Sequence, residues 1–175
     1  MRQDQQMVGM SQIKTAKGPA IYTCIGLGSC IGVAAFDPET EVSGMVHIML
    51  PAAFKDKPVE RPGKYADTGI MALLEELERL GADPARLIMA YAGGAQVFQS
   101  SVPEAGKLDV GARNGNAVGK ILTEMRANVI GCDVGGNQGR AFTFCTLTGQ
   151  IRIRTVTGGE KPLCNVRQIK LRSAA

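Results

Sequence analysis

Three short apolar segments follow one another in the first third of the chain, and each ends at a tight-turn signal. The segments are residues 20–25, 30–36 and 44–50, and the signals that end them are residues 26–29, residues 37–40 and Pro51. Short apolar runs bounded by glycine and proline are typical of β-strands joined by turns. The chain is therefore predicted to begin its fold as consecutive strands of a sheet.

Two amphipathic helices interrupt the later strands. Apolar side chains recur at helical spacing in residues 66–80 and again in residues 114–128, which predicts one buried face on each helix. Further strands are expected at residues 87–91, 129–134, 141–147 and 150–156, the last of these being the final strand. Runs of strands with two inserted helices indicate an α+β fold with mixed, mainly antiparallel sheets.

A single domain is expected to hold these elements. The chain has 175 residues, of which 45% are hydrophobic, and this is enough to bury a core without disulfides or metals. Residues 1–18 are polar and show no periodicity, so they are expected to form a flexible N-terminal arm or an edge piece. Residues 19–175 are expected to form the domain itself.

The composition excludes several classes of function. A net charge of +4 that is spread along the chain, with only 5% aromatic residues, does not fit a nucleic-acid-binding surface. The five cysteines form no CxxC pair, and the one histidine, His47, excludes a His-rich metal site. The polar N-terminus is unlike a signal peptide, and the apolar runs are too short to cross a bilayer. We therefore expect a cytoplasmic protein without membrane insertion.

Cys30 and His47 are the candidate catalytic pair. A cysteine nucleophile needs a base within hydrogen-bond reach, and any mechanism that uses an imidazole must use His47. If Pro38 and Glu39 are the centre of a hairpin, paired residue numbers sum to 77, which places Cys30 directly opposite His47 on the same face. A one-residue bulge would instead move His47 to the other face.

A structural role is the alternative interpretation of both residues. Cysteine is among the most buried residue types, and a single histidine on a strand is often a core residue. The glycine turn before Cys30 favours a site, because the backbone N–H groups of Gly28 and Ser29 could face a developing oxyanion. A redox pair of Cys24 and Cys30 is a further alternative. A structural role is expected for the remaining cysteines, which are Cys132, Cys145 and Cys164.

Several motifs together resemble the CheD family of chemoreceptor glutamine deamidases. They are Gly26-Leu27-Gly28-Ser29-Cys30, Asp37-Pro38, Gly44-Met45, His47 and Met49-Leu50-Pro51, then Lys64-Tyr65-Ala66-Asp67, Ala92-Gly93-Gly94-Ala95, Gly111-Ala112-Arg113-Asn114 and Gly135-Gly136-Asn137. The resemblance covers about residues 20–160. It implies a fold related to bacterial toxin glutaminase domains, with Cys30 as the nucleophile and His47 as the base, and it implies no metal or cofactor.

The chain departs from the family pattern at the third catalytic position. The family usually has a threonine six residues before the cysteine, and this chain has Cys24 there. Thr23 is the neighbouring residue, but strand alternation points it to the opposite face. The group that orients His47 is therefore left open between Cys24, Thr23, a backbone carbonyl and another hydroxyl such as that of Ser29.

The resemblance implies hydrolysis of glutamine side chains to glutamate, with release of ammonia, on the cytoplasmic helices of methyl-accepting chemotaxis receptors. The site is then expected in an open groove, which Gly93, Gly94 and Asn137 could shape; plain turn geometry is the alternative for these three residues. The alternative function is that of a binding partner of a CheC-type phosphatase of the response regulator CheY, with weak or absent catalysis.

Overall fold

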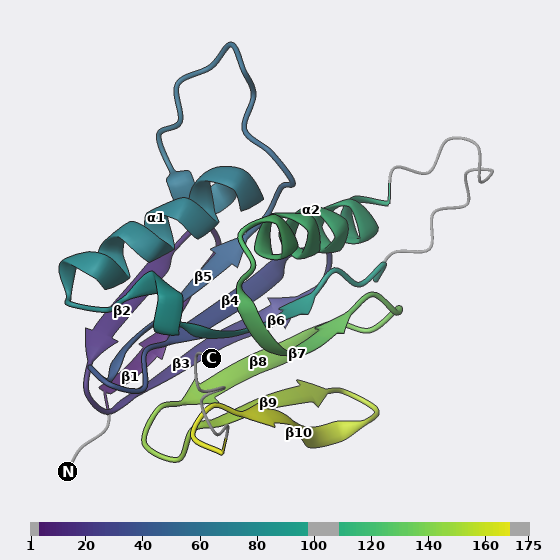
Figure 1. Ribbon diagram of the computed structural model, residues 1–175. Helices are drawn as coiled ribbons and strands as arrows, with labels where there is room; N and C mark the ends of the chain where they lie inside the picture. The colour runs from purple at the N-terminus through teal and green to yellow at the C-terminus, as the bar shows by residue number, and fades with distance from the viewer. Residues whose placement is uncertain (1–3, 98–108, 169–175) are drawn as a thin grey trace.

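The computed structural model describes residues 4–97 and 109–168, and it arranges them in three layers (Figure 1). Helices α1 (Ala66–Arg79) and α2 (Val110–Glu124) cover one face of a five-stranded sheet, and a second five-stranded sheet covers its other face. Two 3-10 helices, η1 (Pro62–Lys64) and η2 (Pro84–Arg86), lie just before α1 and before β6 (Ile88–Gly93). The expected α+β fold with mixed, mainly antiparallel sheets is confirmed.

Each sheet contains one parallel pair of strands, and the other neighbouring pairs are antiparallel. The sheet next to the helices has the order β2 (Ile13–Lys17), β5 (Val42–Ile48), β4 (Ile31–Phe36), β6 and β7 (Asn128–Val134). The outer sheet has the order β1 (Asp4–Met7), β3 (Ala20–Leu27), β8 (Arg140–Cys145), β9 (Gln150–Thr155) and β10 (Gly159–Asn165). The parallel pairs are β6 with β7 and β1 with β3.

The core has two parts because β4 and β5 are buried on both faces. Alternate side chains of these strands face the helices, where Ile31 and Val46 pack with Leu73 of α1. The intervening side chains face the outer sheet, where Phe36 and Met45 belong to a cluster with aromatic residues of β3 and β8. A strand that is buried on both faces reads as a continuous apolar run, which is why the sequence marks these two strands clearly.

The β4–β5 hairpin is shifted by two residues from the predicted register. Paired residue numbers sum to 79, so His47 lies opposite Gly32 and not opposite Cys30. The connection is longer than a two-residue turn, since the N–H of Asp37 donates to the carbonyl of Val42 over 2.8 Å. Because side chains alternate with a period of two, a shift of two keeps His47 on the face predicted for it.

Residues 4–17 form edge strands, which is the second of the two alternatives expected for this segment, and not a flexible arm. These residues form two edge strands: β1 pairs with β3 in the outer sheet, and β2 pairs with β5 in the sheet next to the helices. An edge strand pairs its backbone on one side only and needs few apolar side chains. Because this segment is mainly polar, its two strands show no apolar pattern in the sequence.

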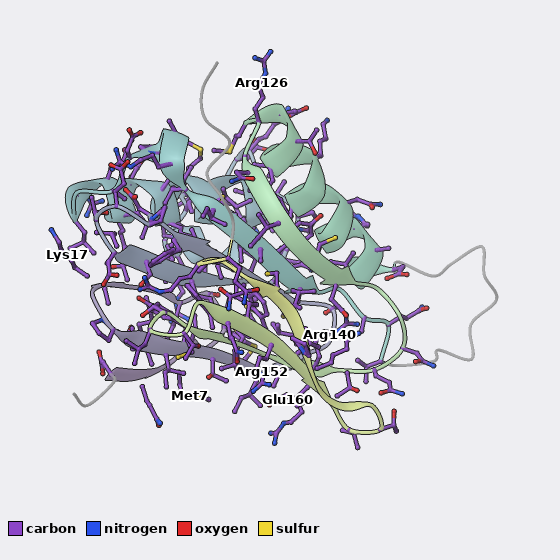
Figure 2. The ribbon with its side chains drawn as sticks, turned by 60° about the horizontal axis from the view of Figure 1, so that its bottom comes forward. Met7, Lys17, Arg126, Arg140, Arg152 and Glu160 are labelled. Atoms are coloured by element: carbon purple, nitrogen blue, oxygen red, sulfur yellow. The ribbon has the colours of Figure 1, made fainter. Side chains whose placement is uncertain are left out.

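The C-terminal half differs from the prediction in two places. Helix α2 begins at Val110 because Asp109 accepts a hydrogen bond from the N–H of Ala112 over 2.9 Å, and it ends before Arg126, whose φ is +54°. Strand β10 follows β9, which had been expected to be the final strand; Arg152 and Glu160 form an ion pair across these two strands (Figure 2).

Within the described ranges, none of the helices is long and apolar enough to span a membrane.

Candidate active site

Three carbonyl groups hold the segment that carries Cys30, which connects β3 to β4. Each of the three accepts a hydrogen bond from another part of the fold. The backbone N–H of Ala95 donates to the carbonyl of Gly28 over 2.7 Å, and that of Gly94 donates to the carbonyl of Cys30 over 2.8 Å. The side-chain amide of Asn114 donates to the carbonyl of Ser29 over 2.8 Å. The backbone around Cys30 is thus fixed both to the end of β6 and to α2.

Gly93 and Gly94 contact the backbone of Cys30 directly. A Cβ atom at Gly93 would overlap the carbonyl oxygen of Cys30, and its φ of +130° is in the region that favours glycine. Both glycines are buried, although Gly94 also reaches a hollow of about 420 Å³ against α2. This arrangement is the turn geometry named above as the alternative to a groove-lining role.

Asn137 lies in a different hollow, of about 250 Å³, between the 135–139 turn and the β9–β10 connection. Arg140 holds this turn, since its guanidinium donates to the backbone oxygen of Gly135 and forms an ion pair with Asp133. Neither Cys30 nor His47 lines this hollow. No hydrogen bond joins Asn137 to Cys30 or His47 among the described residues, but the N–H of Gln96 donates to the carbonyl of Gly136 over 2.9 Å and so ties this turn to the segment after β6 that also supports Cys30.

His47 is buried, with 4% of its surface exposed, and one side of its ring is held by the backbone. Ring atom Nδ1 lies 3.0 Å from the carbonyl oxygen of Val8; because a carbonyl can only accept, Nδ1 carries the proton and donates it. The other ring nitrogen, Nε2, is buried and has no hydrogen-bond partner among the described residues. The neutral ring therefore keeps a free lone pair on Nε2.

The N-terminal segment contacts His47 at three points. Besides the Val8 contact, the N–H of Ser11 donates to the backbone oxygen of His47 over 3.0 Å, and the N–H of His47 donates to the oxygen of Gln12 over 3.1 Å. Val8 is itself fixed, since its N–H donates to the carbonyl of Thr23 in β3 over 2.9 Å. Residues expected to be an arm thus build one wall of the candidate site.

Cys30 and His47 both face the layer between the two sheets. Gly32 lies opposite His47, and Cys30 precedes Gly32 by two positions, which puts its side chain on the same face at a diagonal position. Cys30 is half-buried and packs against the core of this layer. The structure thus confirms a shared face and corrects the predicted direct pairing.

Both side chains are held in their neutral forms. Burial raises the pKa of the Cys30 thiol. Burial also lowers the pKa of His47, although the hydrogen bond to Val8 partly offsets this effect. A neutral thiol that shares a face with an imidazole whose Nε2 is free can give its proton to that nitrogen during nucleophilic attack, and the two groups form no hydrogen bond before the substrate binds. Among the described residues, no three His, Cys, Asp or Glu side chains form a group that could hold a metal ion.

The side-chain candidates for the third position form no hydrogen bond with His47 among the described residues, although Cys24 lies close to the site: a Cβ atom at Gly32, the residue opposite His47, would come within 3.4 Å of its Sγ. Cys24 is fully buried, and its Sγ lies 3.5 Å from the Sδ of Met45. Thr23 points to the other face of β3, where its hydroxyl lies 3.4 Å from that of Thr143. Ser29 contributes its carbonyl to the contact with Asn114. The group that orients His47 is the backbone carbonyl of Val8, one of the alternatives left open above.

Asn114 ends one of the motifs of the family resemblance, but the sequence analysis gave it no role at the site. It is fully buried in α2, and its side-chain amide donates to the carbonyls of Ser29 and Met49, both over 2.8 Å. It therefore joins the segment that carries Cys30 to the end of the strand that carries His47. One signal was present in the sequence: Asn114 precedes the buried residues Val118 and Leu122 at helical spacing, so a polar side chain occupies an apolar helix face.

Comparison with known proteins gives the family. A family model described as CheD chemotactic sensory transduction matches residues 49–155, more than half of the chain. The chain belongs to the CheD family. The matched residues begin just after His47, so the two catalytic candidates lie outside the range of this match.

Relatives extend the similarity of this CheD-family chain to most of its length. A protein of Desulforamulus reducens named probable chemoreceptor glutamine deamidase CheD is 42% identical over 149 residues, which are 85% of this chain and 89% of the relative. One from Desulfitobacterium hafniense with the same name is 45% identical, covering 88% and 95% of the two chains. The chemoreceptor glutamine deamidase CheD of Thermotoga maritima is 37% identical, covering 90% and 96%.

Proposed function

We propose that this protein is a chemoreceptor glutamine deamidase that uses Cys30 as its nucleophile and His47 as its general base. The observation that carries the assignment of these roles is the state of the His47 ring. Its Nδ1 proton is engaged by Val8, and its Nε2 is free on the face that Cys30 shares. The names of the relatives support the choice of a receptor glutamine as the substrate.

The first half of the reaction breaks the amide. Nε2 of His47 accepts the thiol proton of Cys30 as the sulfur attacks the carboxamide carbon of the glutamine. The carbon–nitrogen bond then breaks, and the departing nitrogen takes the proton from the imidazolium and leaves as ammonia. The glutamine side chain is left as a thioester of Cys30.

The second half restores the enzyme. A water molecule gives a proton to Nε2 and attacks the thioester carbon, and the sulfur leaves and recovers the proton from the imidazolium. The product is a glutamate side chain. Thiol, imidazole and water account for every atom in this sequence, so the proposed mechanism uses no metal or cofactor.

Backbone N–H groups are proposed to stabilise the oxyanion of both steps. The candidates are those of Gly28 and Ser29, directly before the nucleophile. The carbonyls of these residues are both engaged by donors from elsewhere in the fold, which keeps the segment in one conformation. A fixed segment is what electrostatic stabilisation of a transition state requires, because its dipoles do not need to reorganise during the reaction.

The proposed partners follow from the substrate. The target is a glutamine on the cytoplasmic helices of a methyl-accepting chemotaxis receptor, so the enzyme is proposed to act in the cytoplasm without inserting into the membrane. Binding to a CheC-type phosphatase stays a prediction from the family resemblance.

The test compares cysteine variants on a purified receptor fragment. Cys30→Ala is expected to lower the rate of ammonia release by about a thousandfold or more, because it removes the nucleophile, and His47→Ala is expected to do nearly the same. Cys132→Ala is the matched control, since Cys132 is exposed and lies outside the site. Mass spectrometry should show a gain of about one dalton per deamidated glutamine. Persistent ammonia release by Cys30→Ala would contradict the mechanism.

A further inference from the structure

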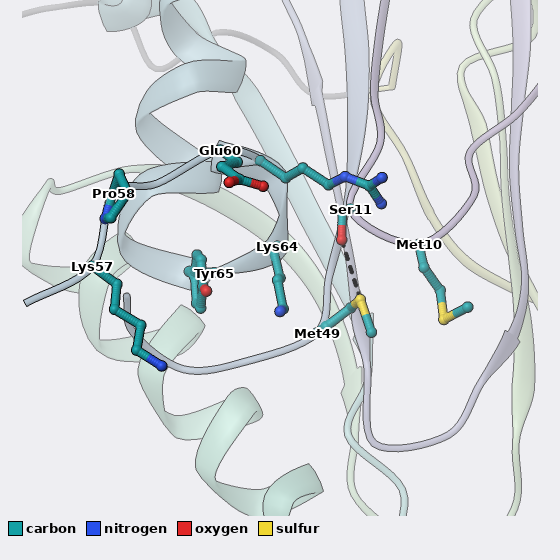
Figure 3. Close-up of a pocket in the computed structure, with 9 residues that line it drawn as sticks. Met10, Ser11, Met49, Lys57, Pro58, Glu60, Lys64 and Tyr65 are labelled. Carbon is teal, nitrogen blue, oxygen red and sulfur yellow. Dashed lines mark hydrogen bonds between the residues drawn. The ribbon is translucent and has the colours of Figure 1, made fainter. Parts of the chain in front are cut away.

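A groove of about 720 Å³ opens beside the candidate active site (Figure 3). One wall is the turn between β1 and β2, with Met10 and Ser11, and the other is the connection from β5 to α1. The residues lining it from this second wall are Met49, Lys57, Pro58, Glu60, Arg61, Lys64 and Tyr65. The proposed reaction uses none of these side chains.

The groove lies next to the strand that carries His47, because two of its lining residues, Ser11 and Met49, are joined to that strand. Met49, two residues after His47, lines it, and the Sδ of Met49 accepts a hydrogen bond from the hydroxyl of Ser11 over 3.2 Å. The N–H of Ser11 in turn donates to the carbonyl of His47. A chain that occupied this groove would therefore pass directly beside the strand that carries the general base.

Positive charge dominates the lining of the groove. Lys57, Arg61 and Lys64 face one carboxylate, that of Glu60, which leaves an excess of two positive charges. Within the described part of the chain, none of these three cations forms a salt bridge. Lysine and arginine side chains that lack an internal carboxylate are free to pair with a ligand of opposite charge.

Aromatic rings hold two of these cations in place. The ammonium group of Lys57 lies 5.6 Å from the centre of the Phe54 ring, and that of Lys64 lies 5.5 Å from the centre of the Tyr65 ring. The two rings pack edge to face, with their centres 6.3 Å apart. Cation–π contacts within about 6 Å are attractive, so the rings restrict the positions of the Lys57 and Lys64 ammonium groups at the groove.

We propose that this groove binds carboxylate side chains that flank the target glutamine on the receptor segment. The inference rests on the proposed deamidase function and adds a substrate preference to it. An acidic segment is the occupant that matches the charge excess, and the position of Met49 and Ser11 places that segment next to His47.

The proposal has a consequence for the order of the reactions. Each turnover converts a neutral carboxamide into a carboxylate, so it adds negative charge to the segment. A glutamine one helical turn from an already formed glutamate then lies close to that carboxylate on the same face. We therefore expect deamidation of one glutamine to increase the rate at a neighbouring glutamine.

The test uses two synthetic helical peptides of equal length, each with one glutamine. In the acidic peptide, the positions one turn before and after the glutamine are Glu, and in the neutral peptide they are Ser. Affinity is measured by fluorescence anisotropy with the Cys30→Ala protein, so that no turnover occurs. The acidic peptide is expected to bind about tenfold more tightly, and this advantage should fall as the ionic strength is raised from about 0.05 to 0.5 M.

Charge-reversal variants locate the effect. The double variant Lys57→Glu, Lys64→Glu is expected to abolish the preference for the acidic peptide, whereas Lys17→Glu should keep it. Lys17, labelled in Figure 2, is an exposed cation at the end of β2, opposite Val42, and it does not line the groove. Equal affinity for the two peptides, or equal effects of the groove and control variants, would overturn the proposal.

The same peptides separate this proposal from the proposed function. If the wild-type protein released no ammonia from either peptide or from a receptor fragment, the deamidase assignment would fail, whatever the binding data showed. If it released ammonia with the same kcat/KM from both peptides, the deamidase assignment would stand and the groove proposal would fail.

Discussion

At the scale of single residues, His47 is the proposed base, and the fold favours its neutral form. Its ring is buried, which lowers its pKa below the ordinary value of 6.5, and its Nδ1 proton is held by Val8. The contribution of this pKa shift to the free energy of unfolding is fully present above pH 6.5, where the ring is neutral in both the folded and the unfolded chain. This contribution is lost as the pH falls below 6.5, because the unfolded chain binds a proton more readily than the folded one.

Titration of His47 can be followed without assignment, because the chain has one histidine. The Hε1 proton resonance is expected to titrate below pH 6.5, and kcat/KM should fall with the same midpoint as the pH is lowered. The Cys30→Ala variant should leave the NMR midpoint nearly unchanged, because the raised pKa of the thiol keeps it uncharged near neutral pH. A sharp drop of the midpoint in this variant would instead indicate a thiolate–imidazolium pair.

At the scale of elements, the site depends on the way α2 joins the two strands that carry it. Asn114 is the contact: it binds the carbonyl of Ser29 before β4 and that of Met49 after β5. Both carbonyls lie at the same end of the hairpin, where Cys30 and His47 are also found. Helix α2 therefore helps to set the relative position of the proposed nucleophile and the proposed base.

Asn114→Ala is expected to lower kcat/KM about a hundredfold, because small displacements of catalytic groups have effects of this size. It should also lower the free energy of unfolding by about 2 kcal/mol, since two buried carbonyls lose their donor. Val118→Ala, one turn later on the same buried face, is the matched control. It should destabilise the protein by a similar amount, about 1–2 kcal/mol, and leave kcat/KM nearly unchanged. Equal losses of kcat/KM in the two variants would show that Asn114 stabilises the fold but does not position Cys30 and His47.

At the scale of the whole molecule, the N-terminal segment ties the two sheets together around the site. Strand β1 belongs to the outer sheet and β2 to the sheet next to the helices, and the residues between them contact His47. The same connection provides one wall of the basic groove. The proposed base and the proposed substrate surface thus share one supporting segment.

Deletion of residues 1–9 is therefore expected to abolish ammonia release and to lower the melting temperature, because it removes β1 and the Val8 carbonyl. The exposed His47 ring should then titrate closer to 6.5, since burial is the main cause of its lowered pKa. Deletion of residues 1–3, which precede β1, is the control and should change neither activity nor melting temperature. Full activity after the longer deletion would contradict the role of this segment.

The sequence by itself determined the elements whose pattern is local. Strands β4 and β5 are buried on both faces and read as apolar runs, and α1 shows one apolar face, so their positions followed from periodicity. The face shared by Cys30 and His47 also followed, because it depends only on strand alternation. Strands β1 and β2 followed only as an arm or an edge piece, and β10 did not follow, because a strand that pairs on one side only needs few apolar side chains to mark it.

Only the tertiary structure decided which groups support the pair. The register of the hairpin depends on a turn that Asp37 and Arg86 hold through an ion pair of 2.8 Å between residues far apart in the chain. The group that orients His47 is a backbone carbonyl, which every residue possesses, so no residue type could mark Val8 in advance. Side-chain chemistry and local periodicity can be identified from the sequence, whereas backbone contacts between distant segments exist only once the chain has folded.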